Sequence, residues 1–276
     1  TNQMLEVQIA QEYTGQQIDV CYLVPMWKEV LDFSTGCGKP EDTVADIISG
    51  RTFGQQRCGM AAVANTGRDA NWTGHDLAGA NLYGFGRLAF DPRLSAEEIA
   101  SEWISLQISR DSDVNRSISD ILLRSREVYE KYTAPLGIGF MVNPAHHYGP
   151  NPEGYEYSKW GTYHRADHLA VGVDRSAGGT GYSEQYFEKN AALFREKGTC
   201  PENLLLFFHR VPYTYRLHSG KTLIQHIYDS HFEGHEQVLQ MQKDWELLEG
   251  RIPQHIFLRV KERFTRQAEN SGNGAM

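Results

Sequence analysis

The sequence predicts a fold that begins as α/β and passes to all-α. Two segments near the start of the chain, residues 5–10 and 59–65, are typical of β-strands, and each is followed by a segment with helical spacing of its apolar residues. Beyond residue 94 the recurring pattern is helical, apart from one long irregular stretch. A chain of 276 residues is long enough for two domains. We predict these domains at residues 1–94 and 95–276.

Both predicted strands lead into polar loops. Apolar and polar residues alternate from Leu5 to Ile9, and the chain reaches Glu12 just before a turn. The second strand runs into the polar residues 66–69. Enzymes built on β/α barrels carry their catalytic groups at the C-terminal ends of the strands. We therefore interpret the first 94 residues as the last two βα units of a (β/α)8 barrel.

The helices of the first domain are predicted from apolar spacing and from the residues that start and stop helices. Pro25 is suited to the first turn of a helix, and Asp91 followed by Pro92 is suited to ending one. The predicted helical segments are 25–33, 41–48 and 74–90.

The second domain is predicted to be mostly α-helical. Ser95 and Glu98 have the spacing of a capping box, in which each side chain satisfies a backbone amide of the other residue. A second helix is predicted to be capped at Asp113 or its neighbour and to stop before Pro135. Further helical segments are 183–197, 201–209, 221–249, with a bend expected at Gly234, and 253–270.

A long irregular segment, residues 137–181, interrupts the helices. It is rich in Gly, Pro, His and Tyr, and its aromatic residues are unlike the composition of disordered chains. Loops of this length inside a compact domain are usually functional. Trp160 lies in this segment, and we predict that it binds substrate. The alternative is a Trp that belongs to the hydrophobic core.

Composition narrows the classes of partner. The net charge of −8 argues against nucleic acid, because phosphate binding needs clustered Lys and Arg. The four cysteines are irregularly spaced, which favours reduced thiols over a disulfide framework. No apolar run is long enough to span a membrane. Two unpaired barrel strands would leave exposed edges, so self-association is expected.

Glu12 is the predicted catalytic residue. A carboxylate at the C-terminal end of a strand, followed by a glycine-containing turn, is placed to act as a general base or nucleophile. The alternative is a Glu that begins a solvated loop.

Arg68, Asp69 and Trp72 are the predicted substrate-binding residues after the second strand. A guanidinium binds a carboxylate with two hydrogen bonds, and an indole ring stacks on a sugar. The alternative is a network that starts the following helix.

Two further patterns do not predict a site. His164 and His168 are four residues apart, but no third metal ligand is evident, so no metal site is predicted. Residues 178–181 resemble a phosphate-binding loop only loosely, because the Lys and the preceding strand are absent. No cofactor is predicted.

Longer motifs resemble a known family, the xylan α-1,2-glucuronidases of glycoside hydrolase family 67. The motifs are residues 11–16 (QEYTGQ), 65–75 (NTGRD followed by NWTGH), 85–92 (FGRLAFDP), 144–168 (PAHHYGP through KWGTYHRADH) and 205–213 (LLFFHRVPY). Together they are highly specific, and the resemblance covers nearly the whole chain.

The resemblance implies an N-terminal α/β domain, a central (β/α)8 barrel and a C-terminal helical domain. It implies removal of glucuronic acid, or its 4-O-methyl form, from xylo-oligosaccharides with inversion, and a cytoplasmic location. Glu12 matches one of two candidate base carboxylates, and Trp160 matches a Trp that lines the substrate pocket. The general acid, a companion Asp and the residues that hold the uronate carboxylate are expected upstream of Thr1. The chain alone is therefore expected to be nearly inactive.

Two alternatives remain open at this point. Glu12 and Asp69, at the ends of neighbouring strands, would form a carboxylate pair able to hydrolyse the xylan backbone. The chain would otherwise be a non-catalytic module that binds xylo-oligosaccharides or has a structural role.

Overall fold

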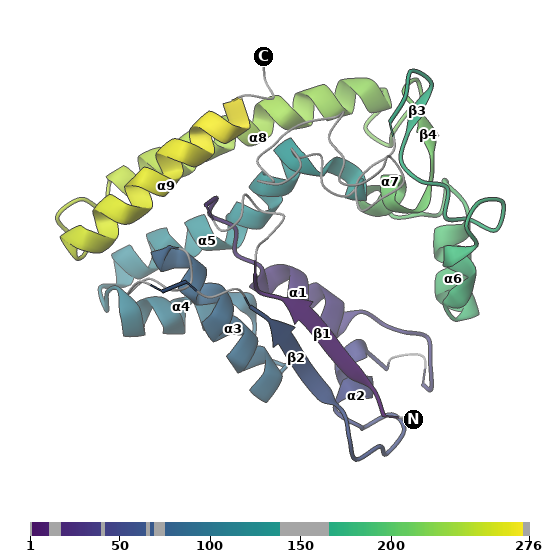
Figure 1. The fold of residues 1–276 in the computed structure, drawn as a ribbon, viewed down its shortest axis with the longest axis horizontal. Coiled ribbons are helices and arrows are strands. Elements are labelled where there is room, and N and C mark those ends of the chain that lie inside the picture. The colour runs from purple at the N-terminus through teal and green to yellow at the C-terminus, as the bar shows by residue number, and fades with distance from the viewer. Residues whose placement is uncertain are drawn as a thin grey trace. The chain divides into compact units, whose positions relative to one another are not determined.

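The computed structural model describes residues 2–10, 18–39, 42–64, 67–68, 75–138 and 166–272, and Figure 1 shows its elements. These elements form two compact units. The first contains Thr1–Val128 and Gln237–Glu269, and the second contains Tyr129–Glu236 and Asn270–Met276. The domain boundary near residue 94 stays a prediction. No helix of the described residues is both long and apolar enough to cross a bilayer.

The first unit contains the two predicted strands, β1 (Met4–Gln8) and β2 (Gly59–Val63). They pair in parallel, with Met4 opposite Gly59 and Gln8 opposite Val63 (Figure 1). Parallel strands need a crossover connection, usually helical. Here it is α1 (Val24–Asp32) followed by α2 (Val44–Ile48). The predicted order of strand, helix and strand is therefore confirmed.

The helices of the connection begin where their capping residues place them. Pro25 lies in the first turn of α1, whose Trp27 and Leu31 are buried. The helix α2 starts later than expected because Thr43 is its N-cap, and the side chain of Thr43 accepts a hydrogen bond from the amide of Asp46.

After β2 the chain enters the 3-10 helix η2 (Asp76–Ala78) and then α3 (Gly79–Phe90). The helix α3 packs against α1, β2 and α4 (Ala96–Gln107). The predicted capping box of α4 is present: Ser95 Oγ accepts from the Glu98 amide at 3.1 Å, and Glu98 Oε2 accepts from the Ser95 amide at 2.8 Å. Gly84 lets α3 approach α1, because a Cβ there would lie 2.2 Å from Val24 Cγ2.

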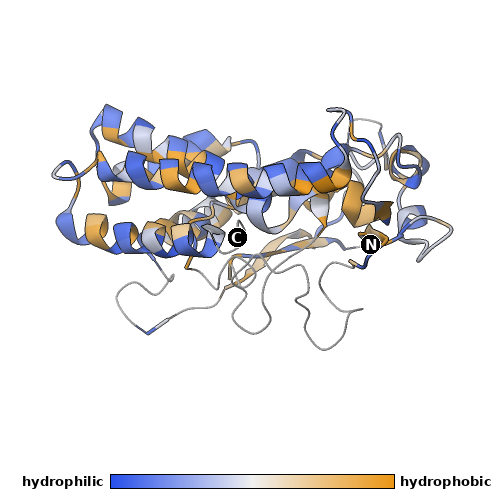
Figure 2. Ribbon diagram, turned by 90° about the horizontal axis from the view of Figure 1, so that it is seen from above, coloured by the Kyte–Doolittle hydropathy of each residue, from blue (hydrophilic) through white to orange (hydrophobic). Residues whose placement is uncertain are grey.

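Three longer helices have residues in both units: α5 (Ser112–Thr133), α8 (Leu223–Glu246) and α9 (Gln254–Gly272). Each of these helices carries both apolar and polar residues along its length, which is typical of amphipathic helices (Figure 2). The cap of α5 is Asp111, whose Oδ1 accepts from the amides of Asp113 and Val114. In the first unit, Trp245 of α8 stacks on Phe257 of α9, at 6.4 Å between ring centroids.

The second unit contains short elements around a hydrophobic core. The strands β3 (Ala170–Val171) and β4 (Val211–Pro212) pair antiparallel. The remaining elements are η3 (Pro135–Gly137), η4 (Tyr182–Gln185), α6 (Glu188–Arg195), η5 (Glu202–Leu204) and α7 (Leu205–Phe208). The core includes Leu136, Val171, Leu206, Val211 and Leu223.

Gly234 has a packing role in the second unit. The helix α8 continues through this residue as one element. A Cβ at Gly234 would lie 3.0 Å from Lys131 Cβ and 3.1 Å from the Tyr132 nitrogen. The glycine at which a bend was expected therefore allows α8 to lie close to the end of α5.

Candidate functional site

The strand ends of the first unit are the place where sequence predicted the chemistry. Ile9 and Ala10, directly after β1, are buried, and the Ile9 amide donates to the Val63 carbonyl at 2.8 Å. Glu12 follows two residues later and lies outside the described residues. The hydrogen bond of Ile9 extends the pairing with β2 one residue beyond β1. The backbone is therefore held in place as far as Ile9.

The other predicted site residues are mostly outside the described part of the chain. Asp69, Trp72 and Trp160 belong to segments that the structure does not describe. Arg68 is described and exposed, and no ion pair joins it to another described residue. The structure thus brings none of the predicted side chains together within its described range. Their roles stay predictions.

The segment Val20–Leu23, which leads into α1, is buried. Its backbone is satisfied by side chains of three helices. The Val20 amide donates to Gln267 Oε1 at 3.0 Å, and the Tyr22 amide donates to Ser125 Oγ at 2.8 Å. Buried backbone groups without partners are costly, so these side chains fix the segment in place.

Asn81 of α3 is the third of these side chains. Its Oδ1 accepts from the Leu23 amide at 2.7 Å, and its Nδ2 donates to the Cys21 carbonyl at 2.9 Å. The side chain is almost fully buried and uses both ends of its amide. One side chain therefore satisfies both a backbone donor and a backbone acceptor of this segment.

A second anchor follows the loop after β2. His75 is buried and is the N-cap of η2, where its Nδ1 accepts from the Ala78 amide at 3.3 Å. Asp76 binds Arg259 of α9 with two hydrogen bonds, at 2.9 Å to Nε and 2.5 Å to the terminal nitrogen. The segment that carries Asp69 and Trp72 is thus followed by Asp76, which is joined to α9 by the ion pair with Arg259.

The surroundings of His75 keep its imidazole neutral. Burial lowers its pKa to about 4, and the nearby Arg263 cation acts in the same direction. The Asp76 carboxylate and a hydrogen bond to the Asp19 backbone raise the pKa only in part. A neutral His75 is required here, because its Nδ1 must accept a hydrogen bond from the backbone.

Sequence reasoning missed these anchors, although Asn81 leaves a detectable signal. It stands at helical spacing between Leu77 and Leu88, which are both buried. A polar residue inside such an apolar stripe needs a buried partner. The sequence does not indicate that the partners of Asn81 are the Leu23 amide and the Cys21 carbonyl.

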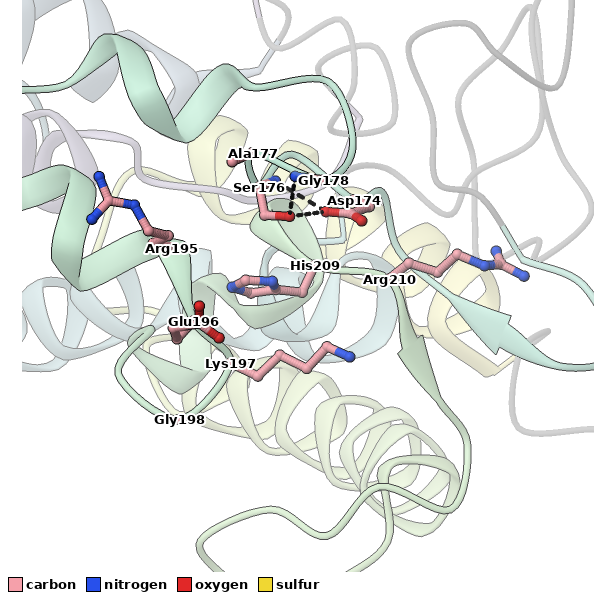
Figure 3. Close-up of a pocket in the computed structure, with 10 residues that line it drawn as sticks. All are labelled: Asp174, Ser176, Ala177, Gly178, Arg195, Glu196, Lys197, Gly198, His209 and Arg210. Carbon is pink, nitrogen blue, oxygen red and sulfur yellow. Dashed lines mark hydrogen bonds between the residues drawn. The ribbon is translucent and has the colours of Figure 1, made fainter.

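The second unit contains a polar pocket of about 430 Å³ (Figure 3). Three segments form it: the loop at residues 174–178, the end of α6 with residues 195–198, and His209 with Arg210 after α7. Figure 3 shows the His209 imidazole among the lining residues, between Ser176 and Glu196. Gly178 of this loop begins the glycine-rich stretch that resembles a phosphate-binding loop only loosely.

The loop at the pocket folds around Asp174. Asp174 Oδ1 accepts from the Ser176 amide at 3.0 Å and from Ser176 Oγ at 2.6 Å, and the Asp174 carbonyl accepts from Thr180. Gly179 must be a glycine, because a Cβ there would lie 2.1 Å from the Asp174 carbonyl oxygen. The glycines of this segment therefore serve a tight turn.

Two of the three cations around the pocket are already paired. Arg195 binds Glu184 at 2.9 Å and Glu188 at 3.2 Å, and these carboxylates raise its pKa. Arg210 binds Asp167 at 2.6 Å. Backbone amides of Leu169 and Ala170, together with Arg210, lower the pKa of Asp167 to about 2. Among the described residues, no cluster of acidic, His and Cys side chains is suited to a metal ion.

The sequence matches two parts of one protein family. Residues 1–72 match the family described as "Glycosyl hydrolase family 67 middle domain". Residues 73–273 match "Glycosyl hydrolase family 67 C-terminus". The change from one match to the other falls between β2 and His75 in the sequence.

Three relatives illustrate the similarity. "Probable alpha-glucuronidase A" of Aspergillus oryzae is 44% identical over 273 residues, which is 98% of this chain and 33% of the relative. The protein of the same name from Aspergillus niger is 42% identical, and "Alpha-glucuronidase A" of Aspergillus tubingensis is 41% identical, each over 98% of this chain and 32% of the relative. The chain thus spans about a third of the length of these curated relatives. With both matches covering nearly all of its residues, the chain belongs to glycosyl hydrolase family 67.

Proposed function

We propose that this chain is part of an α-glucuronidase of xylan breakdown, which removes glucuronic acid or its 4-O-methyl form from xylo-oligosaccharides with inversion. Membership of the family and the names of the relatives support this proposal. The observation that carries it is the parallel pair β1 and β2, whose C-terminal ends precede Glu12 and Asp69 in the sequence. Neither backbone xylan hydrolysis nor a purely non-catalytic role is favoured by these relatives.

In the proposed mechanism Glu12 is the general base. Inversion requires a carboxylate that takes a proton from water on the face of the sugar opposite the leaving group. Trp72 and Trp160 offer flat apolar rings for the sugar, and Arg68 and Asp69 offer polar contacts at the same end of the strands. The anchors at Asn81, Gln267 and Asp76 support the proposal, because a catalytic loop needs rigid neighbours.

We infer further that β1 and β2 are the last two strands of a (β/α)8 barrel. Their parallel pairing and helical crossover support this inference. Met4 is 56% exposed and Val63 is 45% exposed, as expected for apolar side chains that further strands would cover. Where no further strands pair with them, the open edges favour self-association of the chain.

The test replaces Glu12 by Gln in the native protein that contains this chain. Glu12→Gln is expected to lower the release of glucuronic acid from a substituted xylo-oligosaccharide by about 10²–10⁴-fold, since that is the usual contribution of a general base. Glu236→Gln is the matched control, because Glu236 is an exposed carboxylate of α8, away from the strand ends. Equal activity of the two variants would contradict the role of Glu12.

The same proteins test the alternative activity. Reducing sugar released from unsubstituted xylan, and lost in Glu12→Gln, would indicate hydrolysis of the xylan backbone. Release of glucuronic acid with no such reducing sugar would support the proposed reaction.

A further inference from the structure

The pocket of the second unit contains one buried polar atom with no partner. His209 is 4% exposed, and its Nε2 has no hydrogen-bond partner among the described residues. The imidazole lines the pocket and lies centrally among the other lining side chains (Figure 3). Buried polar atoms are normally satisfied, so an unpartnered atom beside a cavity indicates a missing ligand or water.

The protonation of His209 follows from its contacts. Burial lowers its pKa below the ordinary value, and the Lys197 cation acts in the same direction. The Phe194 backbone makes a hydrogen bond to the ring, and Nε2 is unpartnered, so Nδ1 carries the proton that Phe194 accepts. Nε2 of the neutral ring is then an acceptor, and it needs a group that donates.

The rest of the lining offers acceptors and one available cation. Asp174 and Glu196 are exposed carboxylates, and no described residue forms an ion pair with either. Lys197 is exposed and likewise has no ion pair with a described residue. Arg195 and Arg210 are occupied by the carboxylates of Glu184, Glu188 and Asp167.

This set of groups discriminates between classes of ligand. A fully ionised anion has no hydrogen to donate to Nε2, and it would face two carboxylates. A metal ion is disfavoured because no described cluster has suitable ligands. An apolar ligand would leave Nε2 and the charged groups unpaired. Hydroxyl groups both donate and accept, so a polyhydroxyl ligand can satisfy Nε2, the carboxylates and the Lys197 ammonium together.

We propose that the pocket formed by residues 174–178, 195–198 and 209–210 binds an uncharged sugar unit, one of whose hydroxyl groups donates to His209 Nε2. The cavity of about 430 Å³ is within the size range of sites for small ligands. Glu196 accepts a second hydroxyl, and Lys197 donates to a ring or hydroxyl oxygen. This site does not depend on the glucuronidase reaction, because none of its groups belongs to the strand ends.

The experiment follows the His209 nitrogens by NMR in the 276-residue chain with ¹⁵N-labelled histidine. The probe is xylotriose, an uncharged sugar, and sodium sulfate is the anionic comparison. The His209 signals are assigned by their loss in His209→Asn. Xylotriose is expected to shift the Nε2 resonance toward that of a hydrogen-bonded nitrogen, whereas sulfate leaves it in place.

A matched pair of variants ties binding to the pocket. Glu196→Gln is expected to raise the Kd obtained from the His209 shift about tenfold, because a hydrogen bond to a charged group contributes on that order. Glu236→Gln, an exposed glutamate of α8 outside the pocket, should leave the Kd unchanged. A folded variant is identified by its unchanged histidine spectrum elsewhere.

Three results would overturn the proposal. One is an Nε2 resonance that does not move at saturating xylotriose. Another is a shift produced by sulfate in place of xylotriose. The third is equal affinity in Glu196→Gln and Glu236→Gln. Because the readout is binding at His209, loss of glucuronidase activity in any protein has no bearing on it.

Discussion

The hydrogen bonding of buried polar atoms differs between two places in this molecule, the segment behind the strand ends and the pocket. Behind the strand ends of the first unit, the side chains of Asn81, Ser125 and Gln267 each have backbone partners. In the pocket of the second unit, Nε2 of His209 has none among the described residues. The first region is built to hold a segment in one position, and the second retains bonding capacity for another molecule. Whether a buried polar residue has a structural or a binding role is therefore inferred from its hydrogen-bond partners.

The largest effect is expected at Asn81, where the comparison is sharpest. Asn81→Ala leaves the Leu23 amide and the Cys21 carbonyl unsatisfied in a buried site. Each such group costs about 1–3 kcal/mol, so the free energy of unfolding should fall by about 4 kcal/mol. Urea denaturation of the chain measures this change.

Asn115→Ala is the control for that prediction. Asn115 is a partly exposed residue of α5 that donates to the Ser101 carbonyl and to Ser105 Oγ. Water can replace these partners, so the expected loss is below about 1 kcal/mol. Similar losses for the two variants would show that the buried segment is not held by Asn81.

The next effect concerns pH and the neutral His75. Its pKa falls from an ordinary 6.5 to about 4 on folding. As pH decreases through 6.5, the unfolded chain takes up a proton that the folded chain does not, so stability is lost between pH 6.5 and 4. The loss is about 3 kcal/mol at most, and above pH 6.5 the group has no effect.

Unfolding free energies measured across this pH window test the assignment. His75→Gln should reduce the dependence on pH. If this variant retains the slope of the unmodified chain, His75 is not the group that binds the proton on unfolding.

A smaller effect is expected at the pocket loop. Gly179→Ala places a Cβ 2.1 Å from the Asp174 carbonyl oxygen and forces the turn to shift. Overpacking of this kind costs about 2 kcal/mol, and it should also weaken the binding of xylotriose. Gly178→Ala is the neighbouring control, because the nearest atom to its Cβ would be Ser176 Oγ at 3.7 Å. A stable Gly179→Ala chain with unchanged binding would show that this turn does not shape the pocket.

Much of the secondary structure was predictable because its signals are local. Alternation placed β1, the short run at residues 59–65 before a polar loop placed β2, and the spacing of Ser95 and Glu98 placed the start of α4. Local signals also have local errors. Asp111 caps α5 two residues before the expected Asp113, since a cap is chosen by which side chain reaches the first free amides.

The sites were less predictable because their groups are distant in the chain. Gln267 and Val20 are 247 positions apart, and Asp76 and Arg259 are 183 apart. The pocket joins three segments between residues 174 and 210, and no local pattern in the sequence indicates that these segments meet. The predicted residues Glu12, Asp69, Trp72 and Trp160 rest on sequence alone, since they lie outside the described part of the chain, and Arg68 is described only as exposed.

The bond between Gln267 and Val20 has a consequence for how the protein is made. Gln267 of α9 leaves the ribosome 247 residues after Val20, and its side chain supplies the hydrogen-bond partner of that earlier segment. Contacts of such long sequence separation form late and slowly. The backbone of Val20 therefore lacks its Gln267 partner until α9 has been translated. A nascent chain halted just before Gln267 would expose that segment to proteases and chaperones.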